Sequence, residues 1–183
     1  MSLGDGEAAK KRTAALRAMA HPIRLRIMSL LTGAPLTAAE VARELGISHA
    51  NASYHLRNLL TGGLIVSAGE EKIRGGIAKR YRYDAHREEG LGPVPHEQLR
   101  ADFSAVAEEL IRRVRIARVA TEGKLLADAE LWIDQETWRA IRTRVHEAIQ
   151  DLHDAAQPPR TPGTIRTGTT VAMFEMLPPE TEK

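Results

Sequence analysis

The sequence predicts a mostly α-helical protein with a small amount of β structure, an α+β fold. Three observations lead to this prediction. Two short helical patterns joined by a tight turn occupy residues 36–64, two strand patterns surround a glycine pair at residues 64–83, and two long apolar stripes at helical spacing lie within residues 98–155. A chain of 183 residues is long enough for one domain, or two small ones, with a real core.

The chain is predicted to begin with two helices, at residues 8–19 and 22–32. Pro22 suits the first position of the second helix, because proline lacks the backbone N–H that this position leaves unbonded. His21 is interpreted as a structural residue of the helix junction, with a ligand role as the less favoured alternative. The second helix is expected to bury its apolar residues, Ile23, Ile27, Leu30 and Leu31.

Residues 37–60 have the pattern of a helix-turn-helix. Thr37 and Glu40 are spaced as a capping box, and Gly46 stands where a left-handed residue would end the first helix. Ser48 is placed to cap the second helix. The inner face of that helix carries apolar residues at positions i, i+4 and i+7, namely Ala52, Leu56 and Leu59.

The second helix of this motif has no acidic residue from 49 to 60 and presents small or polar side chains outward. Such a surface allows a helix to approach base edges in the major groove of DNA. An ordinary helical hairpin with a solvated outer face is the alternative. The residues predicted to face DNA are Ser48, His49, Ala50, Asn51, Ser53, Tyr54 and Arg57.

Two strands are expected next, at residues 64–66 and 81–83, with Gly75 and Gly76 at the tip between them. A hairpin directly after a helix-turn-helix is a wing, and basic side chains on a wing suit phosphate or minor-groove contact. A charged hairpin that is merely solvated is the alternative. The wing residues predicted to contact DNA are Lys72, Arg74, Lys79 and Arg80.

Five motifs occur in residues 16–84: Leu16-x-x-Met19-Ala20-His21-Pro22-Ile23-Arg24-Leu25-Arg26-Ile27-Met28, Leu36-Thr37-x-x-Glu40-Val41-Ala42, Ile47-Ser48, Ser53-Tyr54-His55-Leu56 and Gly63-Leu64-Ile65. On these motifs, residues 16–84 resemble the winged-helix domain of ArsR-type bacterial transcription regulators. The resemblance implies that Ser53 and its neighbours face DNA. Metal-sensing members of that family use cysteines near the first half of the helix-turn-helix, and this chain has no cysteine.

Charge is distributed unevenly along the chain. Residues 1–84 contain 13 Lys and Arg against 7 Asp and Glu, whereas residues 85–183 contain 13 against 17, which together give the net +2. The basic half is the half with the motif, as expected for binding to double-stranded DNA. The absence of cysteine excludes disulfides and thiolate metal sites. No apolar run approaches 18 residues, so no membrane span is expected. The missing signal region and the inferred DNA target together predict a cytoplasmic protein.

The rest of the chain is predicted to be a linker at residues 85–97 and a helical accessory domain at residues 98–177, after a DNA-binding domain at residues 8–84. A helix is expected at 98–121, where an apolar stripe favours a homodimer seam over packing within one chain. That stripe consists of Leu99, Phe103, Val106, Leu110, Val114 and Ala117.

Asp134 is predicted to cap a further helix, flanked by strands at the end of 124–133 and at 169–177 that pair antiparallel. The helix is expected to have an apolar stripe of Trp138, Ile141, Val145, Ala148, Leu152 and Ala155. His146 and His153 share a helix face, which we interpret as solvated in preference to a metal site. An effector, if one exists, is expected to be either a small organic molecule near Trp132 and Trp138 or a hard or borderline metal held by His and carboxylate side chains.

Three function classes follow from these patterns. The favoured one is a sequence-specific DNA-binding transcription regulator, a homodimeric repressor that does not sense metals through cysteine. The alternatives are a winged helix that contacts protein or RNA, and an enzyme with its site in the C-terminal half. HExxH, Walker-loop, GxSxG and GxGxxG motifs do not occur, so no enzyme activity and no cofactor are expected.

Overall fold

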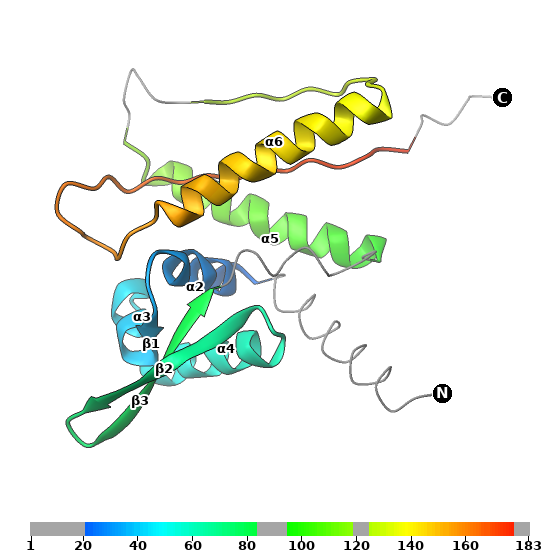
Figure 1. The fold of residues 1–183 in the computed structure, drawn as a ribbon. Coiled ribbons are helices and arrows are strands. Elements are labelled where there is room, and N and C mark those ends of the chain that lie inside the picture. The colour runs from blue at the N-terminus through cyan, green and yellow to red at the C-terminus, as the bar shows by residue number, and fades with distance from the viewer. Residues whose placement is uncertain (1–20, 84–94, 119–124, 178–183) are drawn as a thin grey trace.

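The computed structural model describes residues 21–83, 95–118 and 125–177 (Figure 1). The predicted helix at 8–19 lies outside these residues. The predicted α+β fold with a winged helix-turn-helix is confirmed. Its elements are α2 (Pro22–Gly33), β1 (Leu36–Thr37), α3 (Ala38–Leu45), α4 (His49–Thr61), β2 (Ile65–Ile73), β3 (Gly76–Tyr83), α5 (His96–Arg115) and α6 (Gln135–Asp154).

The two helices of the motif begin and end at the residues that the sequence predicted. The Thr37 hydroxyl accepts from the backbone N–H of Glu40 at 3.3 Å, and the Thr37 N–H donates to the Glu40 carboxylate at 2.7 Å. Gly46 ends α3 in the left-handed region with φ 67°, a conformation that costs glycine little because it has no Cβ. The Ser48 hydroxyl accepts from Asn51 N–H at 3.2 Å and caps α4.

The wing is a longer hairpin than predicted, because β2 and β3 pair antiparallel almost to the tip. Its register shifts between Ser67 and Glu70, where the extra residue is accommodated by Gly69 at φ 106°. This β-bulge faces Arg80 on the partner strand. The short strand β1 was not predicted; it pairs with β3, so the sheet order is β1-β3-β2.

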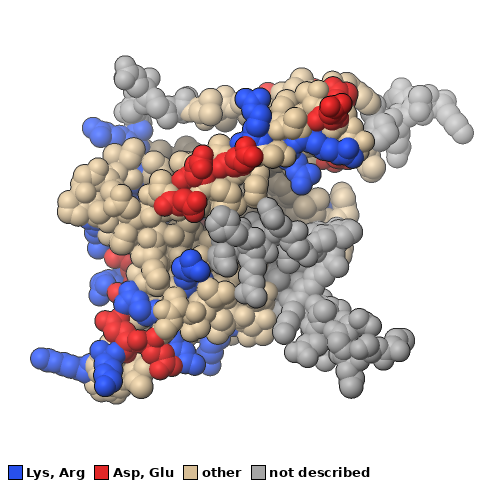
Figure 2. All heavy atoms as spheres, in the orientation of Figure 1, with Lys and Arg blue, Asp and Glu red and all other residues tan. Residues whose placement is uncertain are grey.

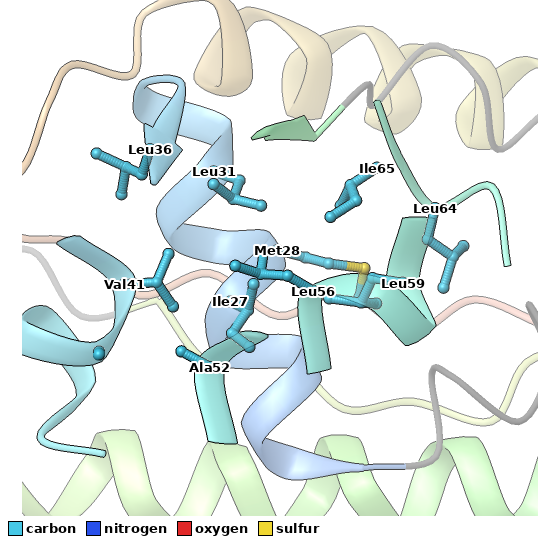
Figure 3. Packing of buried hydrophobic residues seen from close by; sticks show 11 residues of the cluster. Ile27, Met28, Leu31, Leu36, Val41, Ala52, Leu56, Leu59, Leu64 and Ile65 are labelled. Atoms are coloured by element: carbon cyan, nitrogen blue, oxygen red, sulfur yellow. The ribbon is translucent and has the colours of Figure 1, made fainter. Parts of the chain in front are cut away.

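The core lies where α2, α3, α4 and the beginning of β2 meet (Figure 3). Burying a large aliphatic side chain contributes about 1.5–3 kcal/mol to stability, so the buried residues of this core hold α4 against the rest of the domain. Met28 joins the core although it was not among the predicted inner residues of its helix. The largest fully buried side chains are Ile27, Leu31, Val41, Leu56, Leu59 and Ile65.

Helix α5 packs against α2, and it does so with its more polar face. Ala105 and Glu109 are its buried residues. The Glu109 carboxylate accepts from the guanidinium groups of Arg112, at 2.6 Å, and Arg113, at 2.9 Å. Burial alone would raise the pKa of Glu109, but these hydrogen bonds and charges lower it, so the carboxylate stays ionised.

The predicted apolar stripe of α5 is largely left on the surface. Leu99, Leu110 and Val114 are exposed, at 36%, 44% and 64%. Phe103 is half-buried, with its ring centroid 5.4 Å from that of Phe174 in an edge-to-face contact. The helix ends at Arg115 instead of residue 121, so Ala117 follows the helix and does not extend the stripe.

The strand pair predicted beside α6 is wrong. Residues 125–133 and 169–177 are extended, but neither belongs to a sheet in the part of the chain that the structure describes. In Figure 1 the first segment runs above α6 and the second crosses that helix, and the two do not run side by side. A strand needs a neighbouring backbone, and sequence alternation alone does not supply one.

Helix α6 begins after the predicted cap, where the Asp134 carboxylate accepts from Thr137 N–H at 2.8 Å. Trp138, Ile141 and Val145 are half-buried, as their stripe predicted. The stripe then shifts by one position toward the end of the helix, so the predicted residues Ala148, Leu152 and Ala155 are exposed while Ile149 and His153 are half-buried. No residue of α6 is fully buried.

Candidate nucleic-acid interface

Helix α4 has one fully buried face and one open face. Ala52, Leu56 and Leu59 each have 0% exposure, as the helical spacing predicted. The predicted DNA-facing residues lie on the other side: Ser48, His49, Ala50, Tyr54 and Arg57 are exposed, whereas Asn51 and Ser53 are half-buried. The outer surface of α4 therefore offers hydroxyl, amide, imidazole and guanidinium groups on a helix that the core holds in place.

Two contacts along α4 arrange its outer surface. The Arg57 Nε donates to the carbonyl oxygen of Ser53 at 3.3 Å, which lays the arginine back along the helix. Tyr54 is 54% exposed, and the edge of its ring lies against His55 with 5.3 Å between the centroids. Arg57 and Tyr54 keep their polar ends available to a partner outside the helix.

Sequence reasoning missed the role of His55, which is buried on the inner side of α4. Arg24 Nε donates to His55 Nδ1 at 3.4 Å, and the ring of His21 lies 4.9 Å from that of His55. Burial, together with the nearby His21 and Arg24, lowers the pKa of His55. The neutral form is favoured, so His55 joins α4 to the beginning of α2 without adding a buried charge.

His21 is the N-cap of α2. Its Nδ1 accepts from the backbone N–H of Ile23 at 3.2 Å. The predicted structural role of this histidine at the helix junction is thereby confirmed.

Basic side chains extend beside α4 along the wing. Lys72, Arg74 and Lys79 are exposed, and Figure 2 shows Lys and Arg side chains projecting from the end of the hairpin at the lower left. Gly75 supports the tight turn at the tip with φ 96°. Ile73 and Ile77, also near the tip, are exposed at 52% and 63%. The end of the wing thus combines exposed positive charge with exposed apolar side chains.

Arg80, the fourth predicted basic residue of the wing, is oriented toward the domain instead. Its Nη2 donates to the carbonyl oxygen of Pro35 at 2.6 Å and lies 3.7 Å from the Glu40 carboxylate, while its Nη1 pairs with Glu71. The side chain is only 29% exposed. Arg80 therefore connects the wing to the beginning of α3.

Glu40 takes part both in the capping box of α3 and in the ionic contact with Arg80. Burial alone would raise the pKa of Glu40, but hydrogen bonds from Thr37 and the charges of Arg80 and Arg43 lower it. The carboxylate is consequently ionised near neutral pH, which stabilises both the first turn of α3 and the Arg80 contact.

In the part of the chain that the structure describes, no cluster of side chains suggests a metal-dependent site. Among the described residues, no three His, Asp or Glu side chains come together as metal ligands. His146 contacts Gln150, and His153 is half-buried with its ring 6.4 Å from Tyr83. Within the same described part of the chain, no helix is long and apolar enough to cross a membrane.

Comparison with known proteins agrees with this geometry. Residues 19–68 match a protein family described as "Helix-turn-helix domain". A stretch of 60 residues is 43% identical to the HTH-type transcriptional regulator YgaV of Escherichia coli (strain K12). That similarity covers 32% of this chain and 61% of the relative, so the chain spans less than two thirds of the relative's length.

The matched range contains α2, α3, α4 and the beginning of β2, which are the elements that build the core. The fold, the two capped helices and the family match together define residues 19–68 as a helix-turn-helix domain. The hairpin that follows makes it a winged one.

Proposed function

We propose that this protein is a sequence-specific DNA-binding transcription regulator of the ArsR type. The observation that carries the proposal is the two-sided character of α4. Its inner residues Ala52, Leu56 and Leu59 are completely buried. Its outer face is polar, contains no carboxylate and is flanked by a basic wing. The name of the relative, an HTH-type transcriptional regulator, supports the same function.

On DNA, α4 would read the sequence and the wing would hold the backbone. Asn51, Ser53, Tyr54 and Arg57 can donate to or accept from base edges, and Ala50 is small enough for close approach. The wing offers Lys72, Arg74 and Lys79 on a narrow hairpin, which suits phosphates better than a fixed base pattern. Ser48 and His49, at the first turn of α4, lie where a helix N-terminus meets a phosphate.

We further propose that the regulator is a homodimer that acts as a repressor. Two copies would place two copies of α4 on paired half-sites of one operator. The exposed stripe of Leu99, Leu110 and Val114 on α5 supports this assembly, because a helix in a monomer normally turns its apolar face inward. Repression would follow from occupying the operator.

The sharpest test compares variants on a selected operator and on a random duplex. The operator is first obtained by oligonucleotide selection with the full-length protein. Ser53→Ala should then weaken operator binding by about 1–3 kcal/mol, with a much smaller effect on the random duplex, because a base contact is lost. Arg57→Ala should do the same if its guanidinium reaches a base.

The wing should behave differently from α4. Lys79→Ala should weaken binding to both duplexes similarly and reduce the log–log salt slope by about one unit for one lost phosphate contact. Arg142→Ala, an exposed arginine on α6, is the matched control and should change neither quantity. Equal losses on both duplexes for Ser53→Ala, with selective losses for the wing variant, would contradict the proposed roles.

The dimer is tested at α5. Leu110→Glu places a charge in the exposed stripe at a side chain that is 44% exposed, whereas a change at Phe103 would also break its packing on Phe174. Sedimentation should show wild-type dimers at micromolar concentration and Leu110→Glu monomers with weak operator binding. A wild-type monomer with intact operator affinity would refute the homodimer.

Any effector should not be a thiol-reactive agent, since the chain has no cysteine. We propose an organic ligand near α6, where Trp138 is half-buried and Trp132 is 86% exposed. Titration of candidate metabolites with tryptophan fluorescence is the direct assay. Release of the purified protein from DNA by arsenite would contradict this part of the proposal.

A further inference from the structure

Two segments of the C-terminal half are extended but have no strand beside them. Residues 125–133 precede α6, and residues 169–177 come near the end of the described chain. Within the described ranges, neither segment makes a backbone–backbone hydrogen bond. The only hydrogen bond to their backbone found there joins Arg113 Nη1 to the carbonyl oxygen of Thr169 at 3.1 Å. Both segments therefore present open strand edges, which proteins normally cover.

The same two segments expose large apolar side chains. Leu125, Leu126 and Trp132 have 93%, 83% and 86% exposure in the first segment. Leu177 has 89% exposure in the second, where Phe174 and Val171 are about half exposed. In the sequences LWI at 131–133 and VAMF at 171–174, apolar residues occupy both alternating faces. Strands that are apolar on both faces are typical of sheets covered from both sides.

A single chain does not join these segments. In Figure 1 the first, in yellow-green, runs above α6, whereas the second, in orange to red, crosses α6 near its C-terminal end and then runs below it. The second segment is held on α5 by the Phe174 contact with Phe103 and by the Arg113 hydrogen bond. One edge is thus fixed to the body of the subunit, while the other lies beyond α6.

A second copy of this chain would supply a neighbouring strand for each of the two open edges. In a two-fold dimer, any contact of segment 125–133 with the partner's segment 169–177 is repeated by symmetry, so four open edges are used by two identical pairings. Each of the two segments is apolar on both faces. No third component is needed, and the apolar stripe of α5, to which segment 169–177 is attached, becomes part of the same interface.

We propose that residues 125–133 of one subunit pair as a β-strand with residues 169–177 of a second copy. The C-terminal halves of the homodimer would then share a sheet, exchanged reciprocally between subunits. This inference rests on the homodimer proposed above and specifies the surface through which it forms. It also gives the extended conformation of both segments a reason that a monomer does not provide.

The absence of cysteine makes a cross-linking test clean, because every introduced thiol is the only one in its chain. Full-length Leu131→Cys and Val171→Cys proteins are mixed, unfolded and refolded together to exchange subunits, and treated with a short bismaleimide. A covalent heterodimer should account for most of the product. Lys72→Cys, in the exposed wing, replaces Leu131→Cys in the matched control and should give little product with Val171→Cys.

Hydrogen exchange supplies a readout that does not depend on the register of the strands. Peptides from both segments should exchange at least about tenfold more slowly in the wild-type dimer than in the Leu110→Glu monomer, because strand pairing protects backbone N–H groups. Peptides from α4, whose protection comes from the core of the same subunit, should change much less.

The outcomes separate the two proposals. If the wild type sediments as a dimer but gives no heterodimer cross-link, and both segments exchange fast, the exchanged sheet is overturned. The homodimer would still stand in that case. Cross-linking of Val171→Cys with itself in place of the heterodimer also overturns this pairing. A wild-type monomer overturns the homodimer and the exchanged sheet together.

Discussion

Replacing Arg80 with methionine tests whether this residue connects the wing to the domain or contacts DNA. Arg80→Met removes the guanidinium and keeps most of the aliphatic stem. The hydrogen bond to the Pro35 carbonyl at 2.6 Å involves a charged donor, and such bonds contribute about 1.5–3 kcal/mol. The pair with Glu71, which is 48% exposed, adds little because solvent screens it. The contact with Glu40 at 3.7 Å adds a modest amount.

The side chain of Arg80 is 29% exposed, so water recovers part of the loss. We therefore expect Arg80→Met to lower the free energy of unfolding by about 1–2 kcal/mol. For a chain of this size, that corresponds to a melting temperature lower by about 2–8 °C, measured by circular dichroism. Arg82→Met, an exposed arginine on the same strand, is the matched control and should stay within about 0.5 kcal/mol of wild type.

For DNA binding we expect Arg80 to matter less than its exposed basic neighbour on the same strand. Because the Arg80 charge is already paired within the protein, Arg80→Met should leave the salt slope of binding almost unchanged at a temperature where the variant is folded. Lys79→Met, next to it on β3 and exposed, should reduce that slope by about one unit. If Arg80→Met is as stable as Arg82→Met and loses a full unit of slope, Arg80 is a phosphate contact and the structural interpretation is refuted.

Three further predictions concern the helix-turn-helix domain. Leu56→Ala should lower the free energy of unfolding by about 2–5 kcal/mol, because Leu56 is fully buried, whereas Leu60→Ala, 38% exposed on the same helix, should cost much less; urea denaturation measures both. Gly46→Ala should cost about 1 kcal/mol from backbone strain alone, because φ is 67° and a Cβ there would meet no atom within 4 Å; a cost below that of an ordinary surface substitution would contradict this. The lowered pKa of His55 means that the unfolded state binds a proton before the folded state does, so stability should fall as pH decreases below about 6.5. Melting temperatures between pH 7.5 and 5.5 should decrease more steeply for wild type than for His55→Gln, and parallel curves would refute the assignment.

The helix-turn-helix could be predicted from the sequence because its signals are local. The capping box of Thr37 and Glu40, the left-handed Gly46 and the cap Ser48 each act over three or four residues. The spacing of the buried residues on α4 is also local, and the structure places all of them in the core. The outer face of the helix follows from that geometry without further information.

Contacts between distant parts of the chain could not be predicted in the same way. Arg80 was grouped with the other basic residues of the wing. The sequence of the wing does not reveal that the bulge at Gly69 lies opposite Arg80, or that the Pro35 carbonyl is near this arginine. His55 was overlooked because its partners, His21 and Arg24, belong to another helix. In each case the role of the residue depends on a long-range neighbour.

The strand pair of the C-terminal half failed for a related reason. The alternation near Val171 correctly indicated an extended backbone, but pairing depends on which edge comes alongside. Both extended segments lack such an edge within the described subunit. The apolar stripe of α5 shows the same pattern, since its spacing was correct and most of its residues are nevertheless exposed.

The two faces of α5 explain how assembly and DNA reading would be connected. Helix α5 packs against α2 and buries Ala105 and the ionised Glu109, whereas its apolar stripe is largely exposed. Helix α2 in turn packs against α4, and Arg24 on α2 donates to His55 on α4. A short chain of packed helices thus leads from the proposed dimer surface to the proposed reading surface. A ligand that shifted α5 would alter the separation of the two reading helices, because interlocked side chains transmit displacement with little loss.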